Sequence, residues 1–332
     1  MSSSSSVRQE TRVRAFLSAQ AGRWFGEEAR RRWADYIYMA VFVVLVLIAA
    51  SASEVFFTPR NISNLFRQIV TNGLISLGML VVILTAGIDL SVGSIVALSG
   101  ILAAGLTDQI GLVPAILVGL VAGVLVGVVN GLVVARFKLA PFIVTLATMS
   151  AVRGAVYVYS EIPQVPSNPA FRAALGGGFI GPVPVAAVIM VTCFPLVWLF
   201  LNRTTAGRAI VAIGGNEEAV RLAGINVGRH ILLAYMICGF FSGLAGVILA
   251  SRLGIAQPSV GGGYELDAIA AVVIGGGILG GGGGGAVGTF GGVLILGLID
   301  NLLNLFAVQT YYQQILKGFI IVFSVLARRK EG

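Results

Sequence analysis

Long, unbroken apolar runs are the feature that most restricts how this chain can fold. Each extends over roughly 17 to 25 residues, the length that a helix needs to cross the hydrocarbon core of a bilayer. Strands of a membrane barrel would instead alternate apolar and polar residues in segments of about ten. The composition agrees, since hydrophobic types make up 57% of 332 residues and the mean hydropathy is +0.95. The sequence therefore predicts an all-α integral membrane protein.

About ten transmembrane helices are expected, with broken or re-entrant segments among them. Glycine costs roughly 1 kcal/mol relative to alanine in a helix interior. The six-glycine run 280–285 is therefore expected to end its span short of a full crossing or to turn the chain tightly. The predicted spans are 36–54, 62–86, 91–107, 112–134, 141–159, 183–201, 231–251, 265–282, 287–306 and 312–327.

Positive charges in the connections predict the orientation of these spans. With an even number of spans, sixteen lysines and arginines fall on one side of the membrane and three on the other. Both termini and the loop 202–230 are therefore expected in the cytoplasm. The net charge of +8 is read as a topology signal and not as a nucleic-acid surface. We expect a basic, disordered arm at 1–35, a membrane domain at 36–327 and a short cytoplasmic tail at 328–332.

The sequence argues against several classes of chemistry. The one histidine, His230, and the two cysteines, Cys193 and Cys238, offer neither a metal site nor a catalytic triad. None of the three lysines follows a glycine, so the chain has no G-K-[ST] phosphate-binding loop. We expect a protein that is not an enzyme and holds no cofactor. Any ATP that drives it must be bound by another chain.

Asp89 is the most informative polar residue among the predicted spans. A carboxylate at membrane depth costs at least about 2.5 kcal/mol unless it is paired or hydrated. It either caps a helix that starts near Leu90 or contacts a transported solute. Hydroxyls and amides suit a neutral, hydroxyl-rich solute, although many such groups bond only across helices. The candidates for a translocation pathway are Asn72, Asp89, Ser91, Ser94, Asn130, Thr145, Thr148 and Asn301.

Two further patterns concern surfaces. Gly119, Gly123, Gly127 and Gly131 recur every fourth residue, so they form one ridge along a helix and predict close packing with another helix.

Two acidic residues at the expected outer end of a span would meet anything that docks from outside, although capping and solvation explain them equally well. These acids are Glu265 and Asp267.

A short polar helix is predicted within the loop 202–230. Asn216 is a good N-cap, Glu217 and Glu218 occupy the first turn, and Gly224 supplies the stop. A helix of about two turns is too short to be stable unaided. We expect it to dock into a groove of another protein. The alternative is that it lies back on its own membrane domain.

Four stretches of the sequence resemble the ribose-type ABC transporter permeases. "GRAIVAIGGNEEAVRLAGINVGR" at 207–229 is similar to the coupling loop of that family, in which a short cytoplasmic helix docks into the ATPase subunit. "LTAGIDLSVGSIVAL" at 84–98, "NGLVVARFKLAPFIVTLATMSAVRG" at 130–154 and "GYELDAIAAVVIGG" at 263–276 resemble other signature stretches. The resemblance implies that the ATPase-coupling residues are Gly207, Arg208, Gly214, Asn216, Glu217, Glu218, Arg221 and Gly224.

The resemblance also implies a set of partners and a mechanism. The chain would lie in the bacterial plasma (inner) membrane beside a second permease subunit, identical or not, and among membrane lipids. An ABC ATPase would bind ATP and Mg, and an extracytoplasmic sugar-binding protein would dock at Glu265 and Asp267. The pair of permeases would move a monosaccharide by alternating access. One departure is the glycine tract 277–285, where the family typically has a short stretch with serine and arginine.

Other transporters are alternatives. A branched-chain amino-acid permease has a similar architecture, and a furanose-like signalling molecule is a further option for the solute. An ion-coupled secondary transporter or channel would be expected to hold buried carboxylates at the midplane, for which Asp89 is the only good candidate. An intramembrane protease is disfavoured because no catalytic constellation is present.

Overall fold

The computed structural model describes residues 40–51 and 53–329. The predicted arm 1–35 and the end of the predicted tail, 330–332, lie outside the described residues. The chain divides into two units, residues 1–44 and 45–332. In the first unit the described residues, 40–44, belong to an apolar helix whose described part is Ala40–Ser51. The second unit contains all the other elements.

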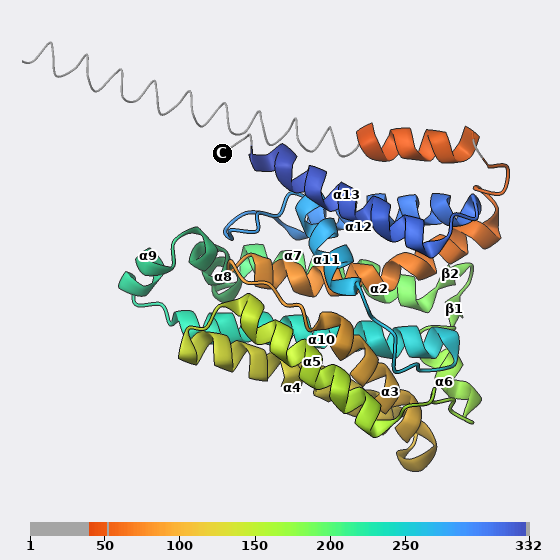
Figure 1. Ribbon diagram of the computed structural model, residues 1–332, viewed down its shortest axis with the longest axis horizontal. Coiled ribbons are helices and arrows are strands. Elements are labelled where there is room, and N and C mark those ends of the chain that lie inside the picture. The colour runs from red at the N-terminus through yellow and green to blue at the C-terminus, as the bar shows by residue number, and fades with distance from the viewer. Residues whose placement is uncertain (1–39, 52, 330–332) are drawn as a thin grey trace, which may run out of the picture. The chain divides into compact units, whose positions relative to one another are not determined.

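The second unit is built almost entirely from helices (Figure 1). Its one sheet among the described residues is a hairpin of two-residue strands. The elements are α2 (Pro59–Ile83), α3 (Val92–Ile110), α4 (Leu112–Phe137), α5 (Pro141–Tyr159), α6 (Pro169–Ala174), β1 (Phe179–Ile180), β2 (Val183–Pro184), α7 (Val185–Arg203), α8 (Thr205–Gly215), α9 (Glu217–Leu222), α10 (Val227–Leu253), α11 (Tyr264–Ile274), α12 (Ala286–Leu305) and α13 (Thr310–Arg329).

The predicted class, an all-α membrane protein, is confirmed. Among the described residues, seven helices are long and apolar enough to cross a bilayer, namely α2, α3, α4, α5, α7, α10 and α12. The expected count of ten is not confirmed. The described part of the first predicted span, Ala40–Ser51, and the 11-residue α11 are shorter than a crossing requires, and α13 is the least apolar of the long helices.

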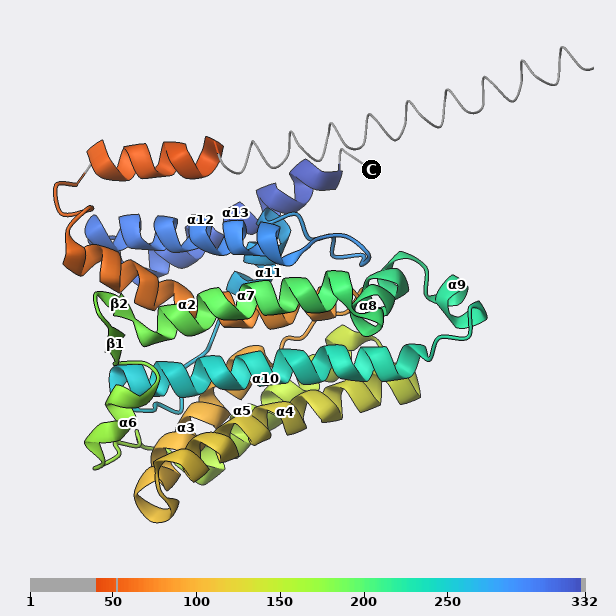
Figure 2. The same ribbon diagram turned by 180° about the vertical axis from the view of Figure 1, so that it is seen from behind.

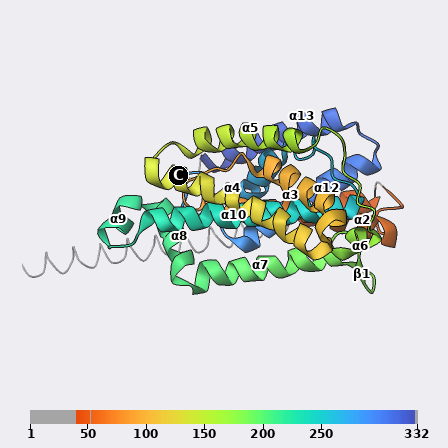
Figure 3. The ribbon, with the colours of Figure 1, turned by 90° about the horizontal axis from the view of Figure 1, so that it is seen from below.

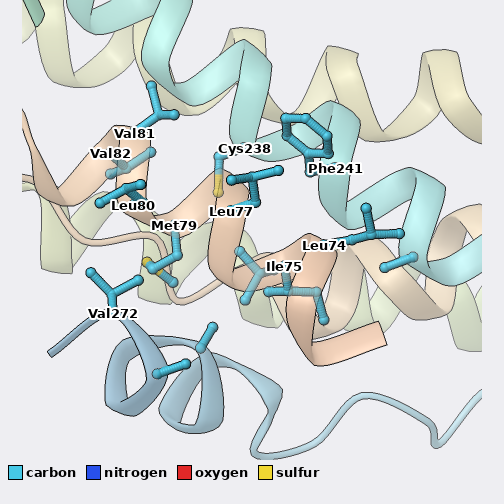
Figure 4. Close-up of a cluster of buried hydrophobic side chains, with 14 of the residues drawn as sticks. Leu74, Ile75, Leu77, Met79, Leu80, Val81, Val82, Cys238, Phe241 and Val272 are labelled. Atoms are coloured by element: carbon cyan, nitrogen blue, oxygen red, sulfur yellow. The ribbon is translucent and has the colours of Figure 1, made fainter. Parts of the chain in front are cut away.

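Helix α2 forms the centre of the unit. Every residue from Gly73 to Leu84 is buried, as expected of a helix that is apolar on all sides and surrounded by others. Figure 4 shows this core, in which Leu74, Leu77 and Met79 lie among side chains of α10 and α11. Helix α2 contacts α10, α11, α12 and α7. Any displacement of α2 therefore changes its packing against four other helices of the bundle.

Helices α4 and α10 make the most extensive helix pair, and the predicted glycine ridge lies in their interface. A Cβ at Gly123 would collide with the Gly239 carbonyl oxygen, and one at Gly127 with that of Tyr235. The backbones approach this closely because glycine has no side chain, so the packing prediction is confirmed. The opposite face of α4 exposes apolar side chains at a four-residue spacing, which suits lipid chains: Val113, Leu117, Val121, Leu125 and Val129.

Two of the long helices are followed by irregular breaks, as the expectation of broken segments requires. Residues 84–91 separate α2 from α3, and residues 254–263 separate α10 from α11. The second break packs on the first turn of α3, where a Cβ on Gly93 would collide with the Gly261 carbonyl oxygen. Helix α11 ends at Ile274, earlier than the predicted end at 282 and before the six-glycine run, so its 11 residues stop short of a full crossing.

The small elements gather at the two ends of the bundle. Helices α8 and α9 lie at one end, with α9 outermost, whereas α6 and the β1–β2 hairpin lie at the other (Figures 1 and 3). We call the first the coupling end, after the predicted coupling residues that it carries, and the second the far end. Helix α10 runs from the coupling end to the far end, and the C-terminal part of α13 returns to the coupling end (Figure 2).

Candidate translocation and coupling sites

The predicted loop helix is confirmed as α9. Its N-cap Asn216 accepts the backbone N–H of Ala219 at 2.9 Å. Arg221 forms ion pairs with Glu217 and, at 3.2 Å, with Glu218. The chain then turns at Gly224, whose φ of +80° favours glycine.

Helix α9 is divided between its own domain and solvent. Val220 is buried against Ile213 of α8 and Val227 of α10, so one face does lie back on the membrane domain. Leu222, in contrast, is 81% exposed, beside the exposed charges of the same helix. A single exposed leucine is ordinary on a protein surface, so the exposure of Leu222 shows only that the described residues leave this face of α9 uncovered. The structure thus leaves α9 anchored on one side and available on the other.

Helix α8 carries the remaining predicted coupling residues, which differ in exposure and in what they contact. Arg208 is exposed. Gly207 is buried against the Phe200 carbonyl at the end of α7. Gly214 is packed so tightly against the Leu84 carbonyl oxygen and Gly281–Gly282 that a Cβ there would collide with both. Gly214 therefore links α8 to the break after α2.

The glycine tract completes this link. The backbone N–H of Gly282 donates to the Leu84 carbonyl at 3.1 Å, and Gly281 also lies against Ala86. Gly281 and Gly282 have φ values of +91° and +71°, which residues with side chains rarely adopt. The tract therefore serves as a close-packed backbone contact between α8 and the 84–91 break. Sequence reasoning missed this role, because nothing local in a glycine run indicates what it packs against.

Asp89 lies fully buried at the centre of the 84–91 break. Its Oδ1 accepts the backbone N–H of Ser91 at 2.9 Å and the Ser91 hydroxyl at 2.6 Å. The Asn130 amide donates to the Ser91 hydroxyl at 2.9 Å and to Asp89 at 3.4 Å. Helix α3 begins at Val92, slightly later than expected, with Ser91 at the N-cap position. Asp89 thus satisfies an N–H just ahead of the helix, close to the capping interpretation.

Most other pathway candidates also hold the break in shape. The Ser94 hydroxyl donates to the Ser91 carbonyl at 2.9 Å. The hydroxyls of Thr145 and Tyr235 both donate to the Ile88 carbonyl, each at 3.3 Å. Ser94 and Thr145 are fully buried, so neither faces open solvent in this conformation. Thr148 is half-buried, one turn further along α5.

The two remaining pathway candidates lie on α2 and α12, away from the Asp89 cluster. Asn301 and Asn61 exchange side-chain hydrogen bonds at 3.0 and 3.2 Å and so join α12 to α2. Asn72 donates to Asp267 at 3.4 Å. The structure therefore does not bring all the predicted pathway residues into one site.

A cavity of about 630 Å³ lies directly beside the 84–91 break. It is lined by Thr85–Gly87, by the α4–α5 connection at Lys138–Pro141 and by Tyr235. Glu217 and Arg221 of α9 complete its wall. The cavity thus lies between α9 and the break that contains Asp89, at the coupling end of the bundle.

Asp267, predicted to contact a binding protein, is mostly buried and ion-paired. Its Oδ2 lies 3.0 Å from Nζ of Lys317, which also lies 3.1 Å from Oδ2 of Asp300. The acids are 14% and 19% exposed, whereas Glu265 is half-buried. Sequence reasoning missed Asp300, although a carboxylate in one predicted span and a lysine in the next indicated a pair. The docking role of Glu265 and Asp267 stays a prediction.

Comparison with known proteins places this architecture in a family. The family model described as "Branched-chain amino acid transport system / permease component" matches residues 61–325. The chain belongs to this family. The matched region begins within α2 and ends within α13, so it contains both breaks, α8, α9 and the glycine tract. The chain is accordingly a multi-pass protein of the bacterial plasma membrane.

Individual members of the family are similar along nearly their whole length. The ribose import permease protein of Bacillus subtilis is 47% identical over 299 residues, covering 89% of this chain and 92% of the relative. The Escherichia coli K12 ribose import permease is 43% identical, covering 88% and 93%. The L-arabinose transport system permease of the same strain is 38% identical, covering 90% and 92%. No solved structure gives a significant match.

Proposed function

We propose that this chain is the membrane-spanning subunit of an ATP-driven importer that moves a monosaccharide into the cell, with D-ribose as the first candidate. The observation that carries the proposal is the 43–47% identity to ribose import permeases across about nine-tenths of the chain. The L-arabinose and D-allose permeases, at 38% and 40% identity, support the broader class of substrate. Specificity would reside mainly in a separate extracytoplasmic binding protein.

A separate ABC ATPase subunit would supply the energy and would bind ATP and Mg. Its docking surface is the exposed side of α9, with Leu222 as apolar anchor and Glu217, Glu218 and Arg221 as charged partners. The exposed ion pairs of α9 contribute little to stability on their own. They remain available for a partner of complementary charge. A second permease subunit, identical or not, would complete the complex.

Force from the ATPase would reach the membrane through α8. Movement of α9 carries Val220 and hence Ile213 of α8, because the two side chains pack together. The end of α8 in turn presses on the Leu84 carbonyl through Gly214 and the glycine tract. The 84–91 break would then shift between inward-open and outward-open shapes. A bias of several kcal/mol between the two is enough to exchange their populations.

The coupling-end cavity is the proposed exit to the cytoplasm, where positive-inside counting places both α9 and the end of α13. One wall is the 84–91 break, whose backbone is held by the hydrogen bonds of the buried Asp89. Asp89 would act as a structural acceptor in this scheme and not as a solute ligand. Solute would leave through the cavity only when the break moves.

A branched-chain amino-acid permease is the second candidate, because the family description names that substrate. The binding protein decides between the two, since a leucine-like ligand is zwitterionic and a pentose is neutral. An ion-coupled carrier is disfavoured because its candidate Asp89 is fully enclosed and hydrogen-bonded to Ser91 and Asn130, and because two other acids are ion-paired. Lys317 compensates Asp267 and Asp300, whereas a proton or sodium carrier needs a carboxylate that its ion can reach.

The test is to extract the tagged chain from native membranes in mild detergent and identify what co-purifies. We expect an ABC ATPase and a binding protein that binds D-ribose or another monosaccharide in preference to leucine. Reconstituted vesicles should take up that sugar only with ATP. Uptake driven by an ion gradient without ATP, or a binding protein selective for leucine, would contradict the proposal.

Variants of α9 test the docking surface within the same experiment. Arg221→Glu and Leu222→Asp should each reduce ATPase co-purification about tenfold or more, because each alters a central contact of a small interface. Membrane insertion should be unchanged, since both side chains are exposed. Arg60→Glu, an exposed charge reversal at the start of α2, is the matched control and should retain the ATPase. Full co-purification of both α9 variants would contradict the assignment.

A further inference from the structure

A second polar cavity lies between α2, α11, α12 and α13, well apart from the coupling-end cavity. It is partly open and has a volume of about 220 Å³, room for roughly seven waters at ~30 Å³ each. It therefore fits one small solute. Arg252, close to the end of α10, and Asn304, close to the end of α12, place the cavity toward the far end.

The charges that line this cavity cancel. Lys317 and Arg252 are cationic, and Asp267 and Asp300 are anionic, so no net charge faces the space. Lys317 bridges both acids at 3.0 and 3.1 Å. An ion entering here would meet no uncompensated partner, whereas a neutral solute avoids that penalty.

Several lining groups can still make hydrogen bonds. Among the described residues, Oδ1 of Asp300 is a buried acceptor without a partner, and a solute hydroxyl reaches it only when the wall of the cavity shifts. The other oxygen of that carboxylate is ion-paired. The amides of Gln68 and Asn304 and the hydroxyl of Thr71 line the same space. These groups offer both donors and acceptors, which is the combination that a row of hydroxyls requires. Tyr264 adds an aromatic side chain that can pack on C–H groups.

We propose that this far-end cavity is a transit site that holds one neutral, polyhydroxylated solute of monosaccharide size as it enters from the binding protein. The inference rests on the proposed function and adds to it a site within the permease itself. Asp300, Asn304 and Gln68 bind hydroxyls, and the Lys317 bridge orients the Asp300 carboxylate. Binding at such a site is weak, because a solute that is held tightly cannot move on.

Protection of an introduced thiol tests binding directly. Asn304→Cys places an exposed thiol on the cavity wall, in a chain with Cys193→Ala and Cys238→Ala. The assembled complex is treated with a membrane-impermeant methanethiosulfonate and D-ribose up to ~100 mM, since the expected affinity is about 1 mM or weaker. We expect D-ribose to slow modification at least about threefold and glycine betaine to leave it unchanged. Gln109→Cys, exposed near the end of α3, is the matched control that neither solute should protect.

Uptake by Asp300→Asn provides the second measurement. Lys317 keeps Asp267 as its partner in this variant, so no unpaired cation is left. Loss of a charged acceptor should lower D-ribose uptake about tenfold to a hundredfold, whereas Asp108→Asn, an exposed acid near the end of α3, should stay within twofold. ATPase co-purification should be normal in both variants.

The outcomes separate this inference from the proposed function. If the unaltered complex imports D-ribose but the thiol at position 304 is modified equally fast with and without sugar, the transit site is wrong and the importer stands. A thiol that is unreactive under all conditions would show that another subunit covers the cavity, which also overturns the site. If the unaltered complex imports no monosaccharide, the proposed function itself fails.

Discussion

At the scale of single residues, the notable feature is a carboxylate that is wholly buried and yet well supplied with donors. Asp89 receives a backbone N–H and a hydroxyl from Ser91 and an amide proton from Asn130. Burial of an ionised group is costly unless such bonds replace its hydration. These short-range hydrogen bonds satisfy the polar groups of residues 87–94. They explain how the chain can end α2 and begin α3 inside the membrane domain.

Asp89→Asn should therefore be well tolerated. An asparagine keeps an oxygen that accepts from Ser91, and its amide can donate to Oδ1 of Asn130, which has no partner among the described residues. We expect near-normal uptake and a loss of stability below about 1 kcal/mol. Asp89→Leu leaves the Ser91 N–H and the Ser91 hydroxyl without their acceptor and should cost about 2 to 4 kcal/mol. Thermal unfolding of the detergent-solubilised protein measures the loss of stability in each variant. If Asp89→Asn folds stably but no longer takes up sugar, Asp89 contacts the solute instead.

At the scale of elements, short and broken pieces carry the proposed mechanism, while long helices supply the frame. Helix α9 is held by one buried side chain, Val220, and is otherwise exposed. Helix α8 ends against the glycine tract, and the tract contacts the break after α2. Elements with few buried contacts are the ones that can move at low cost. Rigid packing of α4 on α10 would confine that movement to the breaks.

Substitutions in the glycine tract test this contact. Gly282→Ala places a side chain on a residue with φ of +71° and drives a Cβ against the backbone of Gly215. We expect ATP hydrolysis to continue in the assembled complex, because α9 and its docking surface are unchanged. Sugar uptake should fall about tenfold, because the contact of the glycine tract with α8 and the 84–91 break is displaced. Gly280→Ala is the matched control, since a Cβ there meets nothing within 4 Å. Equal uptake by the two variants would show that the glycine tract does not transmit movement from α8 to the 84–91 break.

At the scale of the whole molecule, the separation of α8 and α9 from α6 and the β1–β2 hairpin gives the bundle two different ends. Helix α5 is a useful marker of this polarity, because exposed residues flank it on both sides. Leu139 precedes α5 beside the coupling-end cavity, and Ile162 follows it. Charge counting places the first in the cytoplasm and the second outside.

Thiol labelling in spheroplasts tests the orientation. In a chain without Cys193 and Cys238, an impermeant maleimide should modify Ile162→Cys in intact spheroplasts. It should modify Leu139→Cys only after the membrane is opened. The reverse pattern would invert the assignment of the coupling end and, with it, the proposed docking of an ATPase at α9.

The sequence by itself determined whatever depends on neighbours along the chain. Hydropathy over a span length sufficed for the membrane class, and the Asn216 cap with Gly224 sufficed for α9. The glycine tract likewise predicted the early end of α11. The tertiary structure decided which segments meet: the contact of that tract with Gly214, and the bridge from Lys317 to Asp267 and Asp300. The physical reason is that apolar helices in lipid have nearly interchangeable surfaces, so their partners are chosen by close packing and by a few polar contacts between residues far apart in the sequence.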